Sequence, residues 1–149
     1  MISTMSNEWK KGEFTITTKR SDLRIEEILK YLQEDSYWAK DRTSEQMENI
    51  VANSLCFGLY RDKQQIGFAR VVTDYATFAY LGDVYVLSEF RGNGLGIWLM
   101  DIVINHPDLQ GFRRWVLATR DAHKLYEKFG FTELKHPERW MEKAAPGAY

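Results

Sequence analysis

The stretch from Asp83 to Met100 constrains the fold most strongly, because it changes from a strand pattern to a helix pattern across a glycine-rich turn. Residues 83–87 are mostly β-branched or aromatic, which predicts a buried strand. The turn over residues 91–96 reads Arg-Gly-Asn-Gly-Leu-Gly, and its alternate glycines free the backbone for positive φ and for close approach of a ligand. Apolar residues then recur at helical spacing up to Ile102. The predicted order is strand, glycine-rich turn and helix.

A turn of this kind directs several backbone N–H groups and the positive end of a helix dipole towards one point, where a phosphate or pyrophosphate can bind. Two familiar phosphate-binding patterns do not fit the sequence. The P-loop requires Gly-Lys-Ser/Thr after four spacer residues, and the dinucleotide fingerprint requires G-x-G-x-x-G. The turn therefore predicts an anionic ligand without identifying it.

The turn resembles the acetyl-CoA-binding motif of the GNAT superfamily of N-acetyltransferases, Arg/Gln-x-x-Gly-x-Gly/Ala, with Arg91, Gly94 and Gly96 at the matching positions. The resemblance implies that acetyl-CoA is the cosubstrate and that backbone amides of the turn hold its pyrophosphate. It also implies that a backbone N–H near Val86 polarises the thioester carbonyl. The cofactor-binding residues expected in this part of the chain are Val86, Arg91, Gly92, Asn93, Gly94, Leu95 and Gly96.

A second motif supports the same resemblance. Residues 115–119 form another buried strand pattern and lead into residues 121–131, which resemble the A-x-x-L/F-Y-x-x-x-G-F signature of the family. Tyr126 matches the family's tyrosine near the coenzyme A sulfur, which can protonate the leaving thiolate. The alternative for Tyr126 is a half-buried aromatic residue in the core. Many members carry an asparagine that contacts pantetheine where this chain has Thr119-Arg120, so Thr119 or Asp121 is the expected substitute.

A general base is harder to assign. Asp83 is a carboxylate in an otherwise apolar strand, and such a group must be paired, lie at a strand end or be functional, because burying it alone is costly. We name Asp83 as the candidate base or amine-binding group, with a hydrogen-bonded structural carboxylate as the alternative. His123 is expected to face solvent.

Composition favours one folded domain over residues 1–149, with residues 1–12 as a loose N-terminal arm. The chain is 44% hydrophobic and 14% aromatic, which argues against disorder.

Its 20 basic and 21 acidic residues give a net charge of −1, which offers no general attraction to nucleic acid or an anionic membrane. Cys56, the single cysteine, excludes an intrachain disulfide and is expected to be a buried inert thiol. No run approaches the roughly 18 apolar residues of a membrane span. We expect a cytoplasmic protein without a metal ion.

The remaining pattern predicts a mixed α/β or α+β domain, with a GNAT-like, mostly antiparallel central sheet and helices on both faces. A helix from about residue 23 to 35 is expected to be capped by Ser21 or Asp22, and Thr43 with Gln46 forms a capping-box pattern. Gly82 is a candidate bulge. Strands are expected at 14–18, 55–60, 66–73, 78–87, 114–119, 131–134 and 140–143, and further helices at 44–52, after Gly94 and at 121–129.

Two adjacent aromatic residues, Tyr37 and Trp38, interrupt the pattern in a predicted loop over residues 36–42. They either bind the acceptor substrate or pack over the core. The leading hypothesis for the chain is an N-acetyltransferase that transfers acetyl directly to a primary amine of a small molecule or protein. We expect no nucleic acid or membrane partner, and a homodimer is one expected assembly. The alternatives are a non-catalytic acyl-CoA-binding sensor or interaction domain and a nucleotide-phosphate binder.

Overall fold

Strand-forming residues in the first half of the chain build a sheet of successive antiparallel neighbours. In the computed structural model, which describes residues 7–148, six strands lie in the order β1-β2-β3-β4-β5-β6, and only the β5–β6 pair is parallel. The predicted mostly antiparallel sheet is confirmed. The strands are β1 (Glu8–Lys11), β2 (Phe14–Thr17), β3 (Leu55–Arg61), β4 (Gln64–Thr73), β5 (Phe78–Val86) and β6 (Arg114–Val116).

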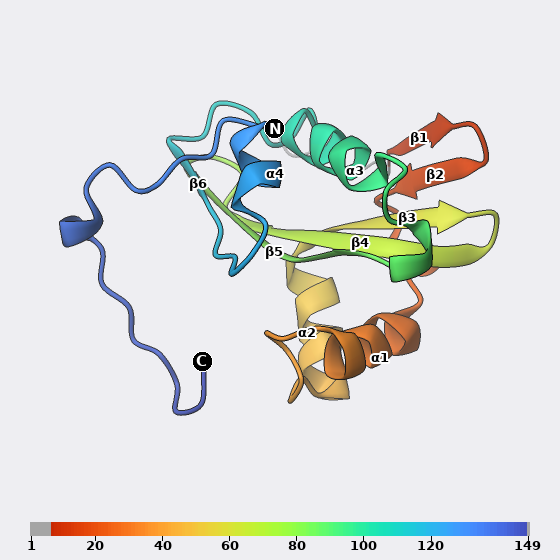
Figure 1. Cartoon of the computed structure of the whole chain (residues 1–149), viewed down its shortest axis with the longest axis horizontal. Helices are drawn as coiled ribbons and strands as arrows, with labels where there is room; N and C mark the ends of the chain where they lie inside the picture. Colours follow the sequence, from red (N-terminus) through yellow and green to blue (C-terminus); the bar gives the residue numbers. More distant parts are fainter. Residues whose placement is uncertain (1–6, 149) are drawn as a thin grey trace.

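Helices cover both faces of the sheet, as the sequence predicts. Helices α1 (Ile25–Asp35) and α2 (Ser44–Asn53) lie on one face, and α3 (Leu95–Ile104) and α4 (His123–Glu127) lie on the other (Figure 1). Each face has its own core of buried apolar side chains, so the sheet is the middle of three layers. Within residues 7–148, no helix combines the length and the hydrophobicity needed to cross a membrane.

The capping predictions have different outcomes. The Thr43–Gln46 capping box is confirmed, because the Gln46 N–H donates to Thr43 Oγ1 at 3.2 Å and the Thr43 N–H donates to Gln46 Oε1 at 2.9 Å. The cap predicted at Ser21 or Asp22 is wrong, since both lie in a short 3₁₀ turn before α1. Instead, the Arg24 N–H preceding α1 donates to Gln65 Oε1 at 2.9 Å, so β4 fixes where the helix begins.

The loose N-terminal arm is wrong for residues 8–11. These residues form β1, where Trp9 pairs with Ile16 and its ring stacks on Phe57 at 6.4 Å between centroids. Gly12, with φ of 60°, makes the tight turn into β2. Tertiary packing of one tryptophan therefore orders a polar segment whose own pattern is weak. Residues 1–6 lie outside the described part of the chain.

The C-terminal third forms fewer strands than predicted. Strand β6 ends at Val116 and not at residue 119, because its pairing with β5 covers only Phe78–Tyr80 before the two strands separate. Gly130 ends the α4 region with φ of 90°, as expected. The strands predicted at 131–134 and 140–143 are absent, and residues 132–148 form an exposed tail that runs away from the β6 end of the domain (Figure 1).

Candidate active site

A cavity of about 710 Å³ opens where β5 and β6 separate. Because their pairing stops at Tyr80 and Val116, the second half of β5 has no strand neighbour on that side among the described residues. The end of β5, the glycine-rich turn, the loop after α1 and the start of α4 all contribute to the walls. The predicted site residues that line the cavity are Tyr37, Trp38, Val86, Arg91, Gly92, Gly94, Leu95, Gly96 and Tyr126.

The glycine-rich turn has the backbone conformation that its sequence predicts. Gly92 and Gly94 have φ of 82° and 75°, and Gly94 directly precedes α3. A Cβ atom added at Gly92, Gly94 or Gly96 would meet no atom within 4 Å, so open space faces all three. The first N–H groups of a helix have no acceptor within that helix, and a glycine offers no capping side chain. The turn thus has room and donors for an anion.

Asn93 is the one predicted turn residue that does not line the cavity. Its side-chain amide donates to the Phe90 carbonyl oxygen at 3.4 Å, on the exposed outer side of the turn. Thr119 also lies outside the lining, because its hydroxyl accepts the Ala122 N–H at 3.1 Å ahead of α4. Asp121, the other candidate in that segment, does line the cavity. Cofactor contacts for Asn93 and Thr119 stay predictions.

The Arg91 side chain folds back onto the protein. Its Nε donates to the Val86 carbonyl oxygen at 2.9 Å, and its terminal nitrogen donates to the Tyr31 hydroxyl at 3.0 Å. Tyr31 in turn stacks on Tyr85, with ring centroids 3.8 Å apart. Arg91 therefore connects the turn to β5 and α1. Tyr31 had no distinguishing pattern in the sequence, since it lies within an ordinary amphipathic helix.

Tyr126 is buried against the wall of the cavity, with 8% of its surface exposed. Its ring meets Phe131 edge-on at 6.0 Å, and its hydroxyl makes no hydrogen bond to any of residues 7–148. The hydroxyl is still accessible, since no fully buried side-chain polar atom in the described chain lacks a partner. Burial raises the pKa of Tyr126 to about 12, with smaller contributions from Tyr37 and Asp121. The phenol is therefore protonated at neutral pH.

Tyr37 bridges two walls of the cavity. Its hydroxyl accepts the backbone N–H of Arg120 at 2.7 Å, and the Arg120 guanidinium lies 3.9 Å above its ring. Its ring also meets Trp38 edge-on at 5.0 Å. The loop after α1 is thus fastened to the segment between β6 and α4, which fixes the width of the cavity at this point. No local pattern in the sequence distinguishes Arg120 from a surface arginine, so its contact with Tyr37 was not predicted.

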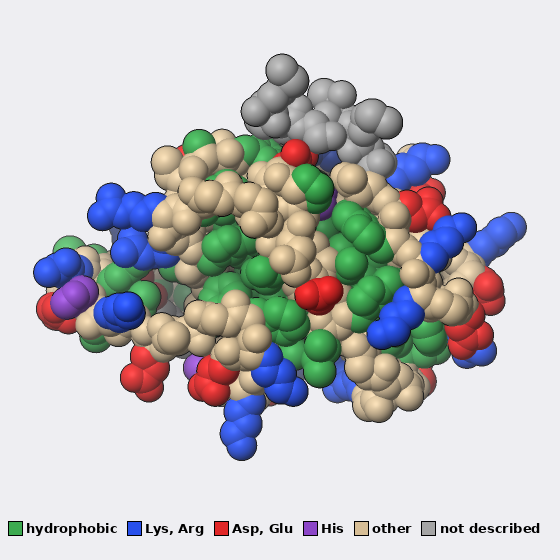
Figure 2. All heavy atoms as spheres, turned by 90° about the horizontal axis from the view of Figure 1, so that it is seen from above, with side chains coloured by type: hydrophobic (Ala, Val, Ile, Leu, Met, Phe, Trp, Pro, Cys, Tyr) green, Lys and Arg blue, Asp and Glu red, His purple; other side chains and the backbone are tan. Residues whose placement is uncertain are grey.

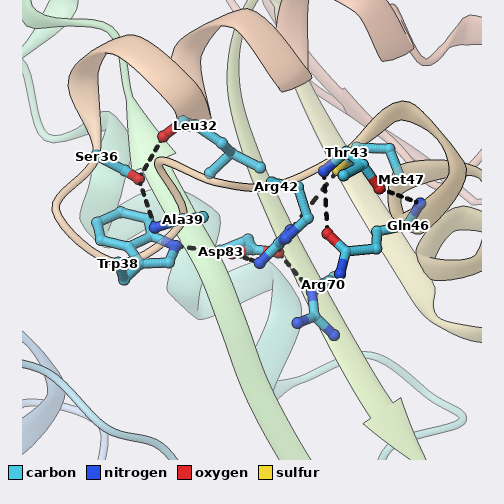
Figure 3. A network of polar contacts seen from close by, with 10 residues as sticks. All are labelled: Leu32, Ser36, Trp38, Ala39, Arg42, Thr43, Gln46, Met47, Arg70 and Asp83. Atoms are coloured by element: carbon cyan, nitrogen blue, oxygen red, sulfur yellow. Dashed lines mark hydrogen bonds and ion pairs between the residues drawn. The ribbon is translucent and has the colours of Figure 1, made fainter. Parts of the chain in front are cut away.

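Asp83 lies at the centre of a polar network beside the cavity (Figure 3). Strand β5 bulges here, since Arg70 pairs with Gly82 but Phe68 pairs with Tyr85, and Asp83 has φ of 51°. The bulge predicted at Gly82 thus falls on the next residue. It turns a carboxylate that is only 2% exposed towards side chains from β4 and from the loop between α1 and α2.

The Asp83 carboxylate accepts four hydrogen bonds. Trp38 Nε1 donates to Oδ1 at 2.7 Å, Arg70 Nε donates to Oδ2 at 2.6 Å, and Arg42 donates to Oδ2 at 2.9 Å and to Oδ1 at 3.3 Å. Burial acts to raise the pKa of Asp83, but the hydrogen bonds and charges of Arg42 and Arg70 outweigh it and hold that pKa below its usual value. Asp83 is ionised, and both of its oxygens are engaged.

This geometry favours the structural alternative for Asp83 over the role of base. Asp83 does not line the cavity, whereas Trp38 does, so Asp83 acts on the cavity by orienting the indole ring. Arg42 and Arg70 are functional neighbours that the sequence did not reveal, because they are 28 residues apart and meet only through the fold. Cys56 is buried, and burial raises its thiol pKa to about 12, as expected of an inert thiol. His123 is exposed, also as expected.

Charged side chains are unevenly distributed over the protein surface. On the face that carries α3 and α4, charged side chains lie mainly around the rim, while hydrophobic side chains and backbone occupy most of the centre (Figure 2). No broad basic surface surrounds the middle of this face. The cavity itself is lined by Lys40, Arg91 and Arg120 as well as by the glycine-rich turn, so a phosphate at the turn would lie near basic side chains as well as amide donors and the α3 dipole.

Sequence comparisons match this chain to acetyltransferases. The family model of the acetyltransferase (GNAT) domain matches residues 52–133. A Gibberella zeae protein described as a "putative acetyltransferase" is 32% identical over 147 residues, which cover 84% of this chain and 82% of that protein.

Solved structures share the fold. A "putative acetyltransferase belonging to the GNAT family" from Xanthomonas campestris pv. campestris is 50% identical, with a TM-score of 0.87 over 90% of this chain and 94% of that one. A "predicted acetyltransferase with acetyl-CoA" from Clostridium acetobutylicum is 16% identical, with a TM-score of 0.63 over 94% of this chain and 96% of that one. The second likeness shows the fold alone.

Proposed function

Because this chain belongs to the GNAT family of acetyltransferases, we propose that it transfers an acetyl group from acetyl-CoA directly to the primary amine of a small molecule or a protein. The observation that carries the proposal is the cavity between β5 and β6. It brings the glycine-rich turn, the free edge of β5 and the hydroxyl of Tyr126 to one place, although Arg91 and Tyr126 are far apart in the sequence.

The residues of the turn fit the cosubstrate. Residues 91–96 would hold the pyrophosphate through backbone N–H groups at the start of α3, in the open space that faces the glycines. The edge of β5 up to Val86 has no strand partner on the cavity side, so its backbone is available to pair with the amide groups of the pantetheine arm. The Clostridium acetobutylicum structure with acetyl-CoA supports this choice of ligand for the same fold.

Acetyl-CoA, when bound, supplies a thioester whose carbonyl carbon the acceptor amine can attack. The C–N bond forms, the C–S bond breaks, and one proton must pass from the amine nitrogen to the departing thiolate. We assign polarisation of the carbonyl to a backbone N–H near Val86, as in other sites where preorganised donors meet developing charge. Tyr37 and Trp38 would bind the acceptor, since their rings line the cavity.

Tyr126 would donate a hydrogen bond to the thiolate as it forms. Its phenol has a pKa of about 12. Complete proton transfer to a thiolate of ordinary pKa, about 8.5, would cost on the order of 5 kcal/mol. We therefore assign Tyr126 the stabilisation of the leaving sulfur, with the net proton coming from the amine. Asp83 is a poor base because its pKa is lowered and both oxygens are engaged. We therefore propose that the acceptor amine arrives neutral and is not deprotonated by this carboxylate.

The test is thiol release from acetyl-CoA across a panel of primary amines, with coenzyme A and ATP affinities measured by calorimetry on the same sample. The proposal expects coenzyme A to bind more tightly than ATP and at least one amine to be turned over. Binding of coenzyme A without turnover of any amine would favour the acyl-CoA sensor. Tighter binding of ATP would favour the nucleotide-phosphate binder.

A further inference from the structure

The basic residues that line the cavity differ in whether the protein already uses them. They are Lys40, Arg91 and Arg120. Arg91 is engaged, because its guanidinium donates to the Val86 carbonyl oxygen and to the Tyr31 hydroxyl. Within the described chain, the guanidinium of Arg120 and the ammonium of Lys40 form neither a hydrogen bond nor an ion pair. Two positive groups in the cavity wall are therefore open to a ligand.

Tyr37 holds the Arg120 side chain in a fixed position. The Tyr37 hydroxyl accepts the Arg120 backbone N–H at 2.7 Å, and the guanidinium carbon lies 3.9 Å from the centroid of the same ring. Stacking uses the face of a guanidinium and leaves the N–H donors at its edge free. Such a planar fork pairs with a carboxylate or a phosphate through two parallel hydrogen bonds, and a side chain that is already held loses less entropy on binding. Arg120 is thus prepared to bind an anionic group.

Arg120 lies on the side of the cavity that we assign to the acceptor. Its ring partner Tyr37 comes with Trp38 from the loop after α1, whereas the pyrophosphate is assigned to the glycine-rich turn at the start of α3. The indole N–H of Trp38 donates to Asp83, so Trp38 offers only its ring to an acceptor. Selection of a polar acceptor at this wall therefore falls to Arg120, with Lys40 as a second cation.

The same cavity also carries negative charge. Asp35 and Asp121 belong to its lining, and neither forms an ion pair with Arg120 or Lys40 among the described residues. A primary amine in water at neutral pH is mostly an ammonium ion, and carboxylates attract that form towards the cavity. A wall with separate positive and negative groups is complementary to a molecule that carries both charges.

We propose, on the premise of the acetyltransferase function above, that the acceptor is a small primary amine that also carries a carboxylate or a phosphate, and that Arg120 binds this anionic group. The bonds that form and break are those of the proposed reaction, so the product is the N-acetyl derivative with its anionic group unchanged. The acceptor shares one cavity of about 710 Å³ with the pantetheine arm, which favours a small molecule over a protein.

Pairs of amines that differ only in the anionic group provide the test. The pairs are phenylalanine with phenethylamine, γ-aminobutyrate with propylamine, and phosphoethanolamine with ethanolamine. We expect kcat/KM of the unaltered protein to favour the charged member of at least one pair by about tenfold or more, the effect of a charge-assisted hydrogen bond. A preference in the first two pairs identifies a carboxylate as the anionic group, and a preference in the third pair identifies a phosphate.

Variants of Arg120 then locate the preference. Arg120→Met should remove it by raising the KM for the charged amine about tenfold or more, while the affinity for coenzyme A is unchanged. Comparing each pair in both proteins cancels the different basicity of the two amines. Arg120→Lys should restore part of the preference, because lysine keeps the charge without the planar fork. Lys124→Met is the control, since it removes the same charge from an exposed position on α4 outside the cavity lining.

Calorimetry separates this inference from the proposed function. Protein saturated with coenzyme A, which has no acetyl group to transfer, is titrated with the same amine pairs. Absence of turnover with every amine contradicts the proposed function, whereas tighter binding of a charged amine that is lost in Arg120→Met supports the inference by itself. Equal binding of both members of every pair, or a preference that Arg120→Met retains, would overturn the inference. A loss of coenzyme A affinity in Arg120→Met with the amine preference intact would assign the guanidinium to the cosubstrate, and would overturn it too.

Discussion

The Asp83 network lies on β5, and the glycine-rich turn follows β5 directly in the chain. The network is built from side chains, whereas the turn is built mainly from backbone. Asp83 is held by the side chains of Trp38, Arg42 and Arg70, and its hydrogen-bonding capacity is used. The turn is made of backbone, and open space lies in front of Gly92 and Gly94. A region whose polar groups already have partners can hold a shape, whereas one with free donors can bind a ligand. Changes in the first should alter folding, and changes in the second should alter binding or turnover.

The largest effect is expected for Gly94→Val. A β-branched residue at φ of 75° is strained, and its side chain would occupy the space assigned to the pyrophosphate. We expect coenzyme A binding to be abolished in calorimetry while the protein stays folded by circular dichroism. Gly111→Val is the matched control, because Gly111 has φ of 78° and equally open space but lies outside the cavity. Unchanged affinity in Gly94→Val, or an equal loss in the control, would contradict the assignment.

The next effect is on turnover, in Tyr126→Phe. The ring and its packing on Phe131 remain, but the accessible hydroxyl of this cavity-lining residue is removed. Coenzyme A affinity should stay near that of the unaltered protein, while kcat should fall by about 10², the low end for a lost proton donor. We expect the low end of this range because the raised pKa of Tyr126 makes it a hydrogen-bond donor more than an acid.

Tyr60→Phe is the control for Tyr126, since Tyr60 is 6% exposed, lies outside the cavity and donates to the Asp22 carbonyl oxygen at 2.7 Å. That variant should lose about 1 kcal/mol of stability and keep its turnover. If Tyr126→Phe behaves in the same way, with a loss of kcat below roughly threefold, then Tyr126 belongs to the core and not to the mechanism.

The same contrast explains how much could be predicted from sequence. The turn was predictable, because glycine spacing and the change from strand to helix pattern are local properties of residues 91–96. The network around Asp83 was predictable only as an anomaly, an acid in an apolar strand. Its partners Arg42 and Arg70 come from other elements, and no local pattern distinguishes them from surface arginines.

The predicted length of β6 was wrong for a related reason. Residues 117–119 continue the apolar run that predicted a strand over 115–119, but a strand also needs a paired neighbour, and β5 has already diverged there. The tail shows the same dependence, since residues 131–134 and 140–143 carry a strand pattern but have no strand beside them among residues 7–148. Side-chain propensity describes what a segment can form, and pairing decides whether it forms.

Asp83→Asn should affect folding more than chemistry. Asparagine tolerates positive φ as aspartate does, so the change removes charge without new backbone strain. Leaving Arg42 and Arg70 without their anion should lower the free energy of unfolding by about 3 kcal/mol, the low end for a broken buried pair because each arginine keeps some exposure. Asp62→Asn, at φ of 53° on an exposed turn, should change it by less than about 0.5 kcal/mol.

The loss of stability in Asp83→Asn should depend on pH with a definite sign. The pKa of Asp83 is lower in the folded protein than in the unfolded chain, so its stabilisation is complete above the unfolded carboxyl pKa of about 3.9. It is lost as the pH falls through the folded pKa. The gap in unfolding free energy between the unaltered protein and Asp83→Asn should therefore be constant from about pH 7 to pH 5 and shrink below about pH 4. A gap that grows on acidification would exclude an ionised Asp83.

The smallest effect tests the contact between the loop after α1 and the segment between β6 and α4. Tyr37→Phe removes the acceptor for the Arg120 N–H but keeps the ring beneath the guanidinium and against Trp38. We expect about 1 kcal/mol of lost stability or less, since the freed amide lies in an exposed segment where water can replace the bond. Tyr80→Phe is a close control, because Tyr80 is 37% exposed against 38% for Tyr37 and makes no hydrogen bond through its hydroxyl to the described residues. If Tyr37 fixes the width of the cavity, its variant should raise the KM for the amine more than it lowers kcat, while Tyr80→Phe leaves both unchanged. Equal effects in the two variants would mean that Tyr37 covers the cavity without setting its shape.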